Sequence, residues 1–233
     1  MLLAGLASLP GPNWMEIKLP RTAQLEPFFL ADNRALDFLN SVSAPSGTEI
    51  ESLNSGQGLV DWLEKAEMIS AEVALYFRKE VSAEKLDEVA AKARNLRQWF
   101  RKFITAHAGR PLKASANIDL NRINLILKRD ESYRQIELRE LQALDSPKYK
   151  LQWRLEKRWR TGEDLLIPVA EAMGDLLCSI DLSQVKICEG PTCFLWFHDV
   201  SKNHTRRWCS MSVCGNRAKA AAHRSKKRAK LKK

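Results

Sequence analysis

The sequence predicts an α+β protein that is mainly helical, in which a helical body with a small antiparallel sheet precedes a small cysteine-rich module with a basic C-terminal helix. Three observations support this fold class. An apolar stripe with a period of about 3.6 residues crosses residues 83–107. Two segments within residues 133–159 alternate apolar and polar side chains. Charge and cysteine content change abruptly after Leu182, where we place the boundary between body and module.

Length and composition are those of an ordinary globular chain. The 233 residues are 45% hydrophobic and 28% charged. This composition suits one large domain or two smaller ones and excludes a collagen-like or wholly disordered chain. No run of about 18 apolar residues occurs, so we expect no membrane-spanning helix. Residues 1–24 are mildly apolar without a basic start, and we interpret them as a loose leader rather than a signal peptide.

The first part of the body alternates short helices with loops. Residues 28–40 supply an apolar face, whereas residues 43–58 are rich in Ser, Gly and Asn, which is typical of a loop. Residues 59–66 have helical spacing, and a second short helix should carry Val73 and Tyr76.

The clearest helix is predicted over residues 83–107. Ser82 is a suitable N-cap, and Gly109 followed by Pro111 supplies the stop. Its opposite face is basic, and we interpret those charges as solvated. The apolar stripe comprises Leu86, Val89, Ala90, Ala93, Leu96, Phe100, Phe103 and Ile104.

The second part of the body combines helices with two strands. Residues 118–127 form a short helix, and residues 133–144 and 149–159 have the pattern of strands joined by an Asp-Ser-Pro turn. Apolar side chains alternate with polar ones in the second strand, which predicts a half-buried strand. Residues 165–180 return to a helical pattern, and Cys178 within it is expected to be a core cysteine.

All of the excess positive charge lies at the C-terminal end. The formal net charge is +10, yet residues 201–233 hold twelve Lys or Arg and no Asp or Glu. The other 200 residues hold 26 basic and 28 acidic side chains. A nearly neutral body with a basic end favours a polyanionic partner, and a solubilising tail is the alternative.

Four of the five cysteines form two C-x4-C pairs, Cys188 with Cys193 and Cys209 with Cys214. Zinc prefers four tetrahedral thiolate or imidazole ligands. Without a secretory signal, a reducing compartment favours metal binding over disulfides. We therefore predict one structural zinc ion held by these four thiolates, a closed set that leaves no position for a substrate water. A redox dithiol and disulfides are the alternatives.

The cysteine module should depend on its metal. A domain of about 45 residues has little core of its own, so zinc would contribute on the order of 10 kcal/mol to its folding. Residues 194–197 can form a strand packed over the site, and residues 210–228 are compatible with a helix. His198, His204 or His223 is an alternative ligand in place of a cysteine.

The module resembles the CGNR zinc finger. Residues 214–217 read Cys-Gly-Asn-Arg, residues 206–211 read Arg-Arg-Trp-Cys-Ser-Met, and residues 197–203 read Phe-His-Asp-Val-Ser-Lys-Asn. Phe194 stands where that family commonly has Gly, which alters the first turn but not the ligand set. 

The body resembles the ABATE domain, which usually precedes this finger. Residues 35–40 read Ala-Leu-Asp-Phe-Leu-Asn, and residues 59–63 read Leu-Val-Asp-Trp-Leu. Together the two resemblances imply a bacterial zinc-binding protein that acts as a stress-related transcription regulator.

The basic segment around the second cysteine pair is the candidate nucleic-acid-binding surface. If residues 210–230 are helical, they span about 30 Å, with small alanines that let the backbone approach a major groove. Base contacts are expected from Arg206, Arg207, Asn216 and Arg217, because the metal site fixes their directions; capping or bonding to the ligand loops is the alternative role of the last two. The other basic residues should contact phosphate. The full predicted set is Arg206, Arg207, Asn216, Arg217, Lys219, Arg224, Lys226, Lys227 and Arg228.

Taken together, these features predict a zinc-binding, DNA-binding bacterial transcription regulator. Residues 25–182 would form the ABATE-like domain, which senses a small-molecule effector or mediates assembly, and residues 183–233 the CGNR zinc finger with its basic tail. The expected partner is double-stranded DNA, with an effector and a homo-oligomer in addition and no membrane. We expect a cytoplasmic, nucleoid-associated protein.

Two other classes of function are alternatives. A module that binds nucleic acid, such as structured RNA, without sequence preference would use the same basic tail. An enzyme with its site in the body is the third hypothesis, but we find no Gly-rich phosphate loop, nucleophile elbow or His-Glu metal pair. Asp32, Asp37 and Asp61 have ordinary helical explanations, and His107 is the one histidine of the body. We therefore expect no enzyme activity.

Overall fold

A computed structural model describes residues 29–43, 49–113, 120–141 and 148–231. The predicted leader, residues 1–24, lies outside these ranges.

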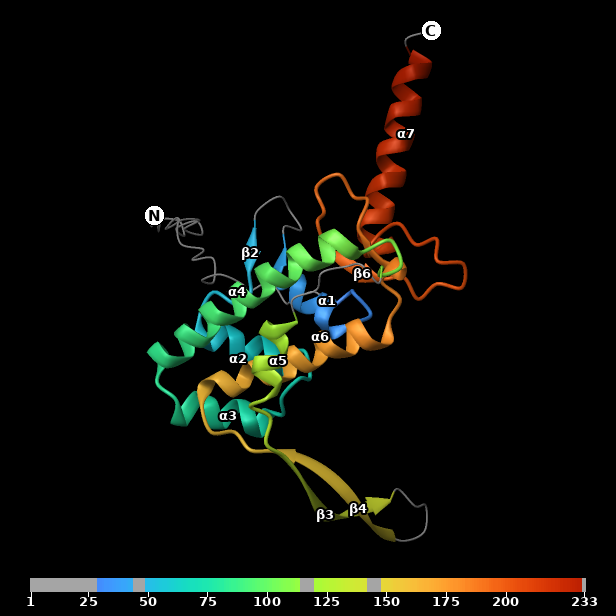
Figure 1. Ribbon diagram of the computed structural model, residues 1–233. Helices are drawn as coiled ribbons and strands as arrows, with labels where there is room; N and C mark the ends of the chain where they lie inside the picture. The colour runs from blue at the N-terminus through green and yellow to red at the C-terminus, as the bar shows by residue number, and fades with distance from the viewer. Residues whose placement is uncertain (1–28, 44–48, 114–119, 142–147, 232–233) are drawn as a thin grey trace, which may run out of the picture.

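The structure confirms a mainly helical α+β protein with small antiparallel sheets (Figure 1). The helices are α1 (Arg34–Leu39), α2 (Gly56–Lys65), α3 (Ala71–Glu80), α4 (Ala83–His107), α5 (Asn121–Leu127), α6 (Ile167–Ser179) and α7 (Asn216–Leu231), with short helical turns η1 (Gly162–Leu166), η2 (Leu182–Gln184) and η3 (Met211–Gly215). The strands are β1 (Val42–Ser43), β2 (Ile50–Glu51), β3 (Ser132–Leu141), β4 (Lys148–Lys157), β5 (Val185–Ile187) and β6 (Trp196–His198).

The helices α1 to α4 each begin at a polar N-cap. The side-chain oxygen of the cap accepts a hydrogen bond from a backbone N–H of the first turn, which satisfies one of the donors that a helix leaves without a partner. Ser82 performs this role for α4, as the sequence predicts. The caps are Asn33, Ser55, Ser70 and Ser82.

The body core is built around α1 and α4. Helix α1 is buried from Ala35 to Leu39 and packs against α4, α6 and β6. Helix α4 runs from Ala83 to His107 as predicted, and all eight residues of its predicted apolar stripe are buried. Gly56 lets α2 approach α4 closely, because a Cβ there would lie 2.2 Å from the Cβ of Leu86.

The predicted loop over residues 43–58 contains ordered structure. Strand β2 lies within it, and α2 already begins at Gly56. Arg97, buried on α4, donates hydrogen bonds to Ser41 Oγ at 2.6 Å and Glu51 Oε1 at 2.8 Å. Burial by itself would raise the pKa of Glu51. The hydrogen bonds and the positive charge of Arg97 have the larger effect, so the pKa of Glu51 is lowered. An ion pair between buried Arg97 and partly buried Glu51 therefore fixes this segment to α4, which local composition does not reveal.

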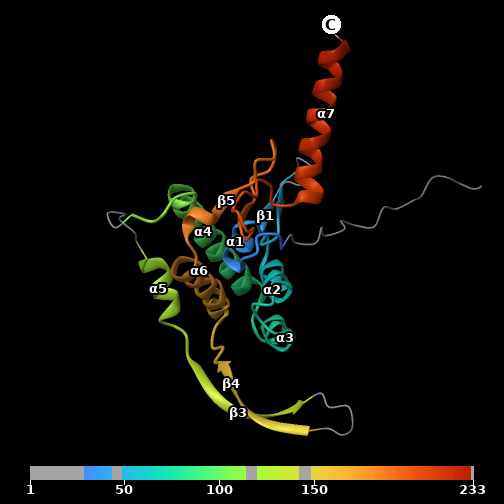
Figure 2. The ribbon, with the colours of Figure 1, turned by 90° about the vertical axis from the view of Figure 1, so that its right-hand side faces the viewer.

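Strands β3 and β4 form an antiparallel hairpin that leaves the body at the end opposite α7 (Figures 1 and 2). The prediction that its second strand is half-buried is wrong. Leu151, Trp153 and Leu155 are each 66% exposed. The alternation correctly indicates an amphipathic strand, but no element of the described chain covers the apolar face.

Cys178 is exposed, so the expectation of a core cysteine is wrong. Helix α6 buries Met173 and Leu176 instead. At 100° per residue, Cys178 is turned well away from Leu176 and lies in the last turn of the helix. Apolar neighbours in the sequence therefore do not show that Cys178 lies on the buried face of the helix.

Candidate metal centre and basic helix

The strands β5 and β6 carry the module and join it to the body. They pair antiparallel, with Val185 opposite His198 and Ile187 opposite Trp196. Successive side chains of a strand point to opposite sides. Val185 and Trp196 therefore belong to the body core, whereas Phe197 packs into a second apolar cluster with the cysteines.

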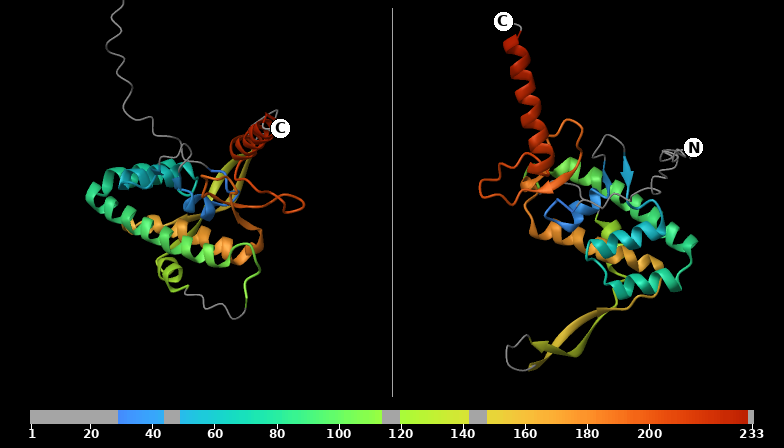
Figure 3. Two further views of the ribbon diagram at one scale, coloured as in Figure 1. Left: turned by 90° about the horizontal axis from the view of Figure 1, so that it is seen from above. Right: turned by 180° about the vertical axis from the view of Figure 1, so that it is seen from behind.

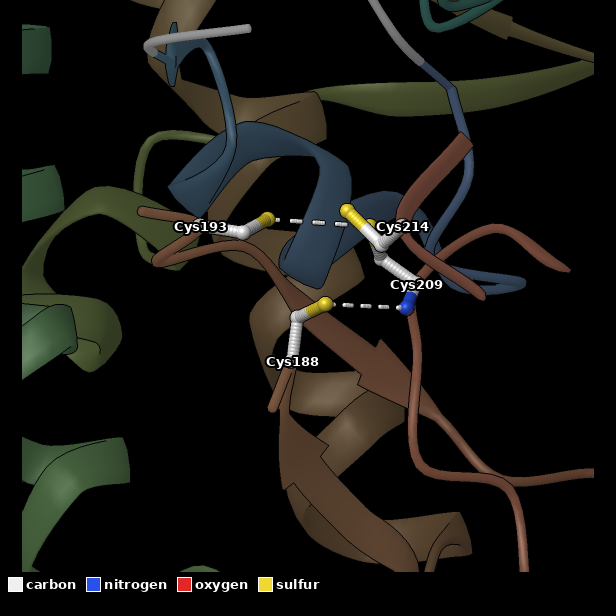
Figure 4. Close-up of side chains that lie close together, drawn as sticks. All are labelled: Cys188, Cys193, Cys209 and Cys214. Atoms are coloured by element: carbon white, nitrogen blue, oxygen red, sulfur yellow. Dashed lines mark hydrogen bonds between the residues drawn. The ribbon is translucent and has the colours of Figure 1, made fainter. Parts of the chain in front are cut away.

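The four predicted ligands converge on one point (Figure 4). All four Sγ atoms of Cys188, Cys193, Cys209 and Cys214 lie within 4.8 Å of one another. The Cys193–Cys209 and Cys209–Cys214 separations are 3.7 and 3.8 Å. Four thiolates at 2.3 Å from a tetrahedral zinc ion stand about 3.8 Å apart. The donor set and its spacing thus fit one zinc ion.

The backbone around Cys188 is shaped for thiolate ligands. The amide N–H groups of Gly190 and Cys209 each lie 3.4 Å from Cys188 Sγ and donate to it. Gly190 sits so close to the cluster that an added Cβ would lie 3.0 Å from Cys193 Cβ and 3.3 Å from Cys214 Sγ. Any larger residue there would therefore press on two of the ligands.

The electrostatics of the cysteine cluster favour binding of a cation. Hydrogen bonding from Cys209 lowers the pKa of Cys193 to about 5. Burial and the neighbouring thiols raise the pKa of Cys214 to about 11, and hydrogen bonding to Cys193 together with burial raises that of Cys209. Four thiolates confined to one small space repel each other, so a divalent cation at their centre stabilises the fully deprotonated set.

Helix α7 begins directly at the metal cluster. Cys214 lies in the π-helical turn η3, whose cap Ser210 accepts a hydrogen bond from the Val213 amide at 3.3 Å. The helix then runs from Asn216 to Leu231, about 24 Å at 1.5 Å per residue. It projects away from the body (Figure 3). Its N-terminal end, the positive end of the helix dipole, lies two residues after Cys214, a favourable position for an anionic thiolate.

Arg206, a predicted base contact, is directed inward and bridges the module to the body. Its guanidinium donates to Trp208 O at 3.0 Å and to Cys209 O at 2.5 Å within the module. It also donates to Leu30 O at 3.1 Å and pairs with Asp32. The Arg206 guanidinium lies 4.4 Å from the centre of the Phe197 ring.

Arg207 and Asn216 lie at the edge of the metal cluster. Arg207 pairs with Glu189 at 2.6 Å and stacks over Trp208 at 5.0 Å. Asn216 is exposed and donates to Ser212 O at 3.1 Å. This last contact is the local capping role that the sequence offered as the alternative to base contact.

The remaining predicted contacts lie on α7. Arg217, Lys219 and Arg224 are exposed. The structure describes the helical backbone of Lys226, Lys227 and Arg228, but their side chains lie outside the described part.

Asp199 anchors the loop between β6 and the second cysteine pair. It is fully buried and accepts from Lys186 Nζ at 2.6 Å, from the Arg206 amide at 2.9 Å and from Ser201 Oγ at 2.5 Å. Burial alone would raise the pKa of Asp199, but these hydrogen bonds outweigh it and hold the pKa well below its usual range. Its role is therefore to position the loop.

The sequence reasoning missed the contact that joins the two parts. Asn40, the C-cap of α1, forms two hydrogen bonds with the backbone of Trp196, and the Ala31 carbonyl accepts from the His198 amide at 2.8 Å. Asn40 falls within the ABATE-like string, but only the tertiary structure brings it to β6, 156 residues away.

His198, His204 and Asp61, which the sequence raised for other roles, make ordinary contacts. His198 lies 3.1 Å from Gln184 Oε1 and His204 2.8 Å from Asp199 O, and the cluster of candidate ligands in the described chain contains cysteines alone. Asp61 pairs with Arg78 at 2.6 Å. 

Two family models match the chain, in the order that the resemblance implied. The model described as ABATE, "Putative stress-induced transcription regulator", matches residues 32–180, and the CGNR zinc finger matches residues 184–227. A search of curated proteins found no match. Within the described residues, no helix combines the length and apolarity needed to cross a membrane.

Proposed function

Because this chain belongs to the ABATE family and carries a CGNR zinc finger, we propose that it is a zinc-dependent, DNA-binding transcription regulator. Zinc folds the cysteine module, and the module presents α7 to double-stranded DNA. The observation that carries the proposal is the direct continuation of the fourth ligand, Cys214, into an exposed helix within an acid-free basic segment.

The basic helix supplies the phosphate contacts. Residues 201–233 contain twelve Lys or Arg and no acidic residue, so no acidic side chain within this segment offsets its positive charge. Lys219 and Arg224 are exposed on a helix that stands clear of the body. The proposed phosphate contacts are Lys219, Arg224, Lys226, Lys227 and Arg228. Each such contact releases counterions, so binding should weaken steeply as salt rises.

Base contacts are assigned to the junction between the cysteine cluster and α7. Arg207, Asn216 and Arg217 lie there, and the metal fixes the backbone that carries them. Arg206 has its donors engaged by Asp32 and by four backbone carbonyls. We therefore assign Arg206 a positioning role that supports this junction rather than a contact with a base.

The body is proposed to sense a small molecule and to pass the signal through α1. A cavity of about 420 Å³ lies between α3 and the base of the hairpin, lined by Tyr76, Tyr133, Trp159 and polar neighbours. Cavities of 300–1,000 Å³ suit small ligands. A thermal-shift screen of metabolites tests the assignment: hits should lose their shift in Tyr76→Ala and keep it in Leu75→Ala, a neighbouring exposed position. Equal shifts in both variants would mean that the effector does not bind in this cavity.

The test of DNA recognition is a selection from fragmented genomic DNA with zinc-loaded protein at about 200 mM salt, where generic phosphate binding fades. An enriched motif is the expected result. Binding without any enriched sequence would instead favour the second candidate, a nonspecific nucleic-acid-binding module that uses the same basic tail. Binding that persists unchanged after removal of residues 186–233 would overturn both. 

The proposal places the protein in the cytoplasm, associated with the nucleoid. Four free thiols at metal-binding spacing suit a reducing compartment. A DNA-binding regulator acts where the chromosome is. Fluorescence microscopy of a tagged chain should show overlap with stained DNA, and a uniform distribution would count against nucleoid association.

A further inference from the structure

Beyond its base, which lines the proposed effector cavity, the β3–β4 hairpin has no part in the proposed function. Its two strands, of ten residues each, project from the body at the end opposite α7 (Figures 1 and 2). In an antiparallel pair, residues directly opposite each other point to the same face. The register therefore sorts the hairpin into two chemically different faces.

One face is apolar and open to solvent. The pairs Ile136–Trp153 and Leu138–Leu151 form its centre. Its six large side chains, each between 57% and 66% exposed, are Ile136, Leu138, Tyr149, Leu151, Trp153 and Leu155. A monomeric protein rarely exposes more than a few hundred Å² of contiguous apolar surface. This face is therefore a candidate docking surface.

The opposite face is already adapted to water. Gln152 Nε2 donates to Glu137 Oε1 at 2.5 Å, and Arg154 donates to the other oxygen of Glu137 at 3.2 Å. Arg139 approaches Gln152 at 3.3 Å, and Arg154 also pairs with Glu156. These bonds lower the pKa of Glu137. A charged ladder of this kind needs no cover, so the docking surface is the apolar face alone.

The hairpin is fixed to the body at its base. Lys157 Nζ pairs with Asp130 at 3.1 Å and with Glu171 of α6 at 2.6 Å. Just beyond β4, the Trp159 ring meets Phe77 of α3 edge to face at 5.6 Å. The body therefore presents the apolar face as a supported arm, which limits the ordering cost of docking.

We propose that this face binds the same face of a second copy of the chain, giving a two-fold symmetric dimer. Charge complementarity favours this occupant. Arg134 and Glu140 lie on the apolar face at opposite ends of β3, and within the described residues neither takes part in an ion pair. Two sheets stacked about 10 Å apart leave room for such side chains to meet across the interface.

The two-fold operation pairs these charges with each other. An axis in the interface plane, perpendicular to the strands, reverses the strand direction and keeps β3 over β3 of the other copy. Arg134 of one copy then faces Glu140 of the other, twice, while Ile136 faces Leu138 and Trp153 faces Leu151. A surface that complements itself under rotation is the requirement of a two-fold interface. 

The area is consistent with a dimer of moderate strength. Six large side chains from each copy bury on the order of 1,000 Å² in total, the lower end of specific interfaces. Because the hairpin and α7 lie at opposite ends of the molecule, such a dimer would hold its two basic helices apart rather than side by side.

Sedimentation equilibrium of the zinc-loaded full chain tests the proposal. The wild type should show twice the 26.6 kDa chain mass at micromolar concentrations. Trp153→Lys should restore the monomer mass with unchanged zinc content, because the side chain is mostly exposed in the monomer and the fold of each chain should persist. The control Gln135→Lys adds the same charge to the opposite face of the hairpin and should remain dimeric.

Charge exchange identifies the occupant as a second copy. Arg134→Glu and Glu140→Arg alone should each raise the dimer dissociation constant at least about ten-fold, because each places like charges opposite each other. An equimolar mixture of the two variants should recover the dimer. In the mixed dimer, the acidic side chains at positions 134 and 140 of one chain face the basic side chains at positions 140 and 134 of the other. A wild type that stays monomeric, a Trp153→Lys variant that dimerises normally, or a mixture that does not recover would each overturn the proposal.

Discussion

The side chain of Asn40 is bonded at both ends to the backbone of Trp196. Its Nδ2 donates to the Trp196 carbonyl at 2.7 Å, and its Oδ1 accepts from the Trp196 N–H at 2.9 Å. Asn40 is the C-cap of α1 in the body, and Trp196 begins β6 in the zinc module. One amide therefore completes the hydrogen bonding of the strand that carries the module, and it does so in a buried position.

Asn40→Ala should destabilise the chain by about 2–4 kcal/mol. The substitution leaves a buried N–H and a buried carbonyl without partners, and each such loss costs about 1–3 kcal/mol. Urea unfolding measures the change. Asn216→Ala is the matched control, because that amide is exposed and makes one bond to Ser212; its effect should stay below about 0.5 kcal/mol. Equal losses in both variants would mean that the Asn40 bridge contributes little.

Cys209→Ser should abolish stoichiometric zinc binding. Cys209 is the ligand whose Sγ lies 3.7 and 3.8 Å from those of Cys193 and Cys214. Loss of an outer hydrogen-bond partner typically lowers metal affinity by roughly 10–100-fold. Loss of one of the four ligands should lower the zinc affinity by more than this. Metal analysis after dialysis gives the stoichiometry, expected to be one zinc per wild-type chain.

The fifth cysteine is the control for that experiment. Cys178 is exposed and lies on α6, outside the cluster. Cys178→Ser should therefore retain one zinc per chain. A loss of zinc in Cys178→Ser, or its retention in Cys209→Ser, would contradict the assignment of the ligand set.

Asp37→Asn should stabilise the protein above neutral pH. Burial raises the pKa of Asp37 to about 6, although its Oδ1 accepts from the amides of Leu30 and Ala31 at 3.0 Å. A folded pKa above the ordinary 3.8 means that ionisation opposes folding. That cost is absent below pH 3.8 and complete above about pH 6. Asn keeps the acceptor and cannot ionise, so the gain at pH 8 should be about 1–3 kcal/mol.

The pH dependence distinguishes this cause from a simple packing change. The difference in unfolding free energy between wild type and Asp37→Asn should shrink as the pH falls from about 8 to 5. Asp175→Asn, at an exposed position on α6, should show no such trend. A gain for Asp37→Asn that is constant across this range would exclude ionisation as its source.

The sequence predicted features that depend on local pattern. The stripe of α4 was found from its period, since residues three and four apart share one helix face whatever the rest of the chain does. The ligand set followed from spacing, because two C-x4-C loops can close on one ion. Both inferences need only neighbours in sequence.

Features that depend on distant partners escaped prediction. Alternation in β4 indicates two unlike faces, but burial depends on whether another element covers the apolar one, and in the described chain none does. Arg206 sits in a basic run beside the metal site, so its charge and position suggested a nucleic-acid contact. Its partner Asp32 is 174 residues away, and only the fold shows that the guanidinium joins module to body.

The most direct test of the central claim is the salt dependence of DNA affinity for two matched variants. Lys219→Ala/Arg224→Ala removes two exposed charges from α7, and Lys79→Ala/Lys102→Ala removes two exposed charges from the body. Fluorescence anisotropy with a labelled duplex gives the slope of log K against log salt for each zinc-loaded protein. The slope of the α7 variant should be smaller in magnitude than the wild-type slope by about 2, because two phosphate contacts are lost. The slope of the body variant should equal that of the wild type. Equal slopes for the two variants would contradict the claim that α7 is the surface presented to DNA.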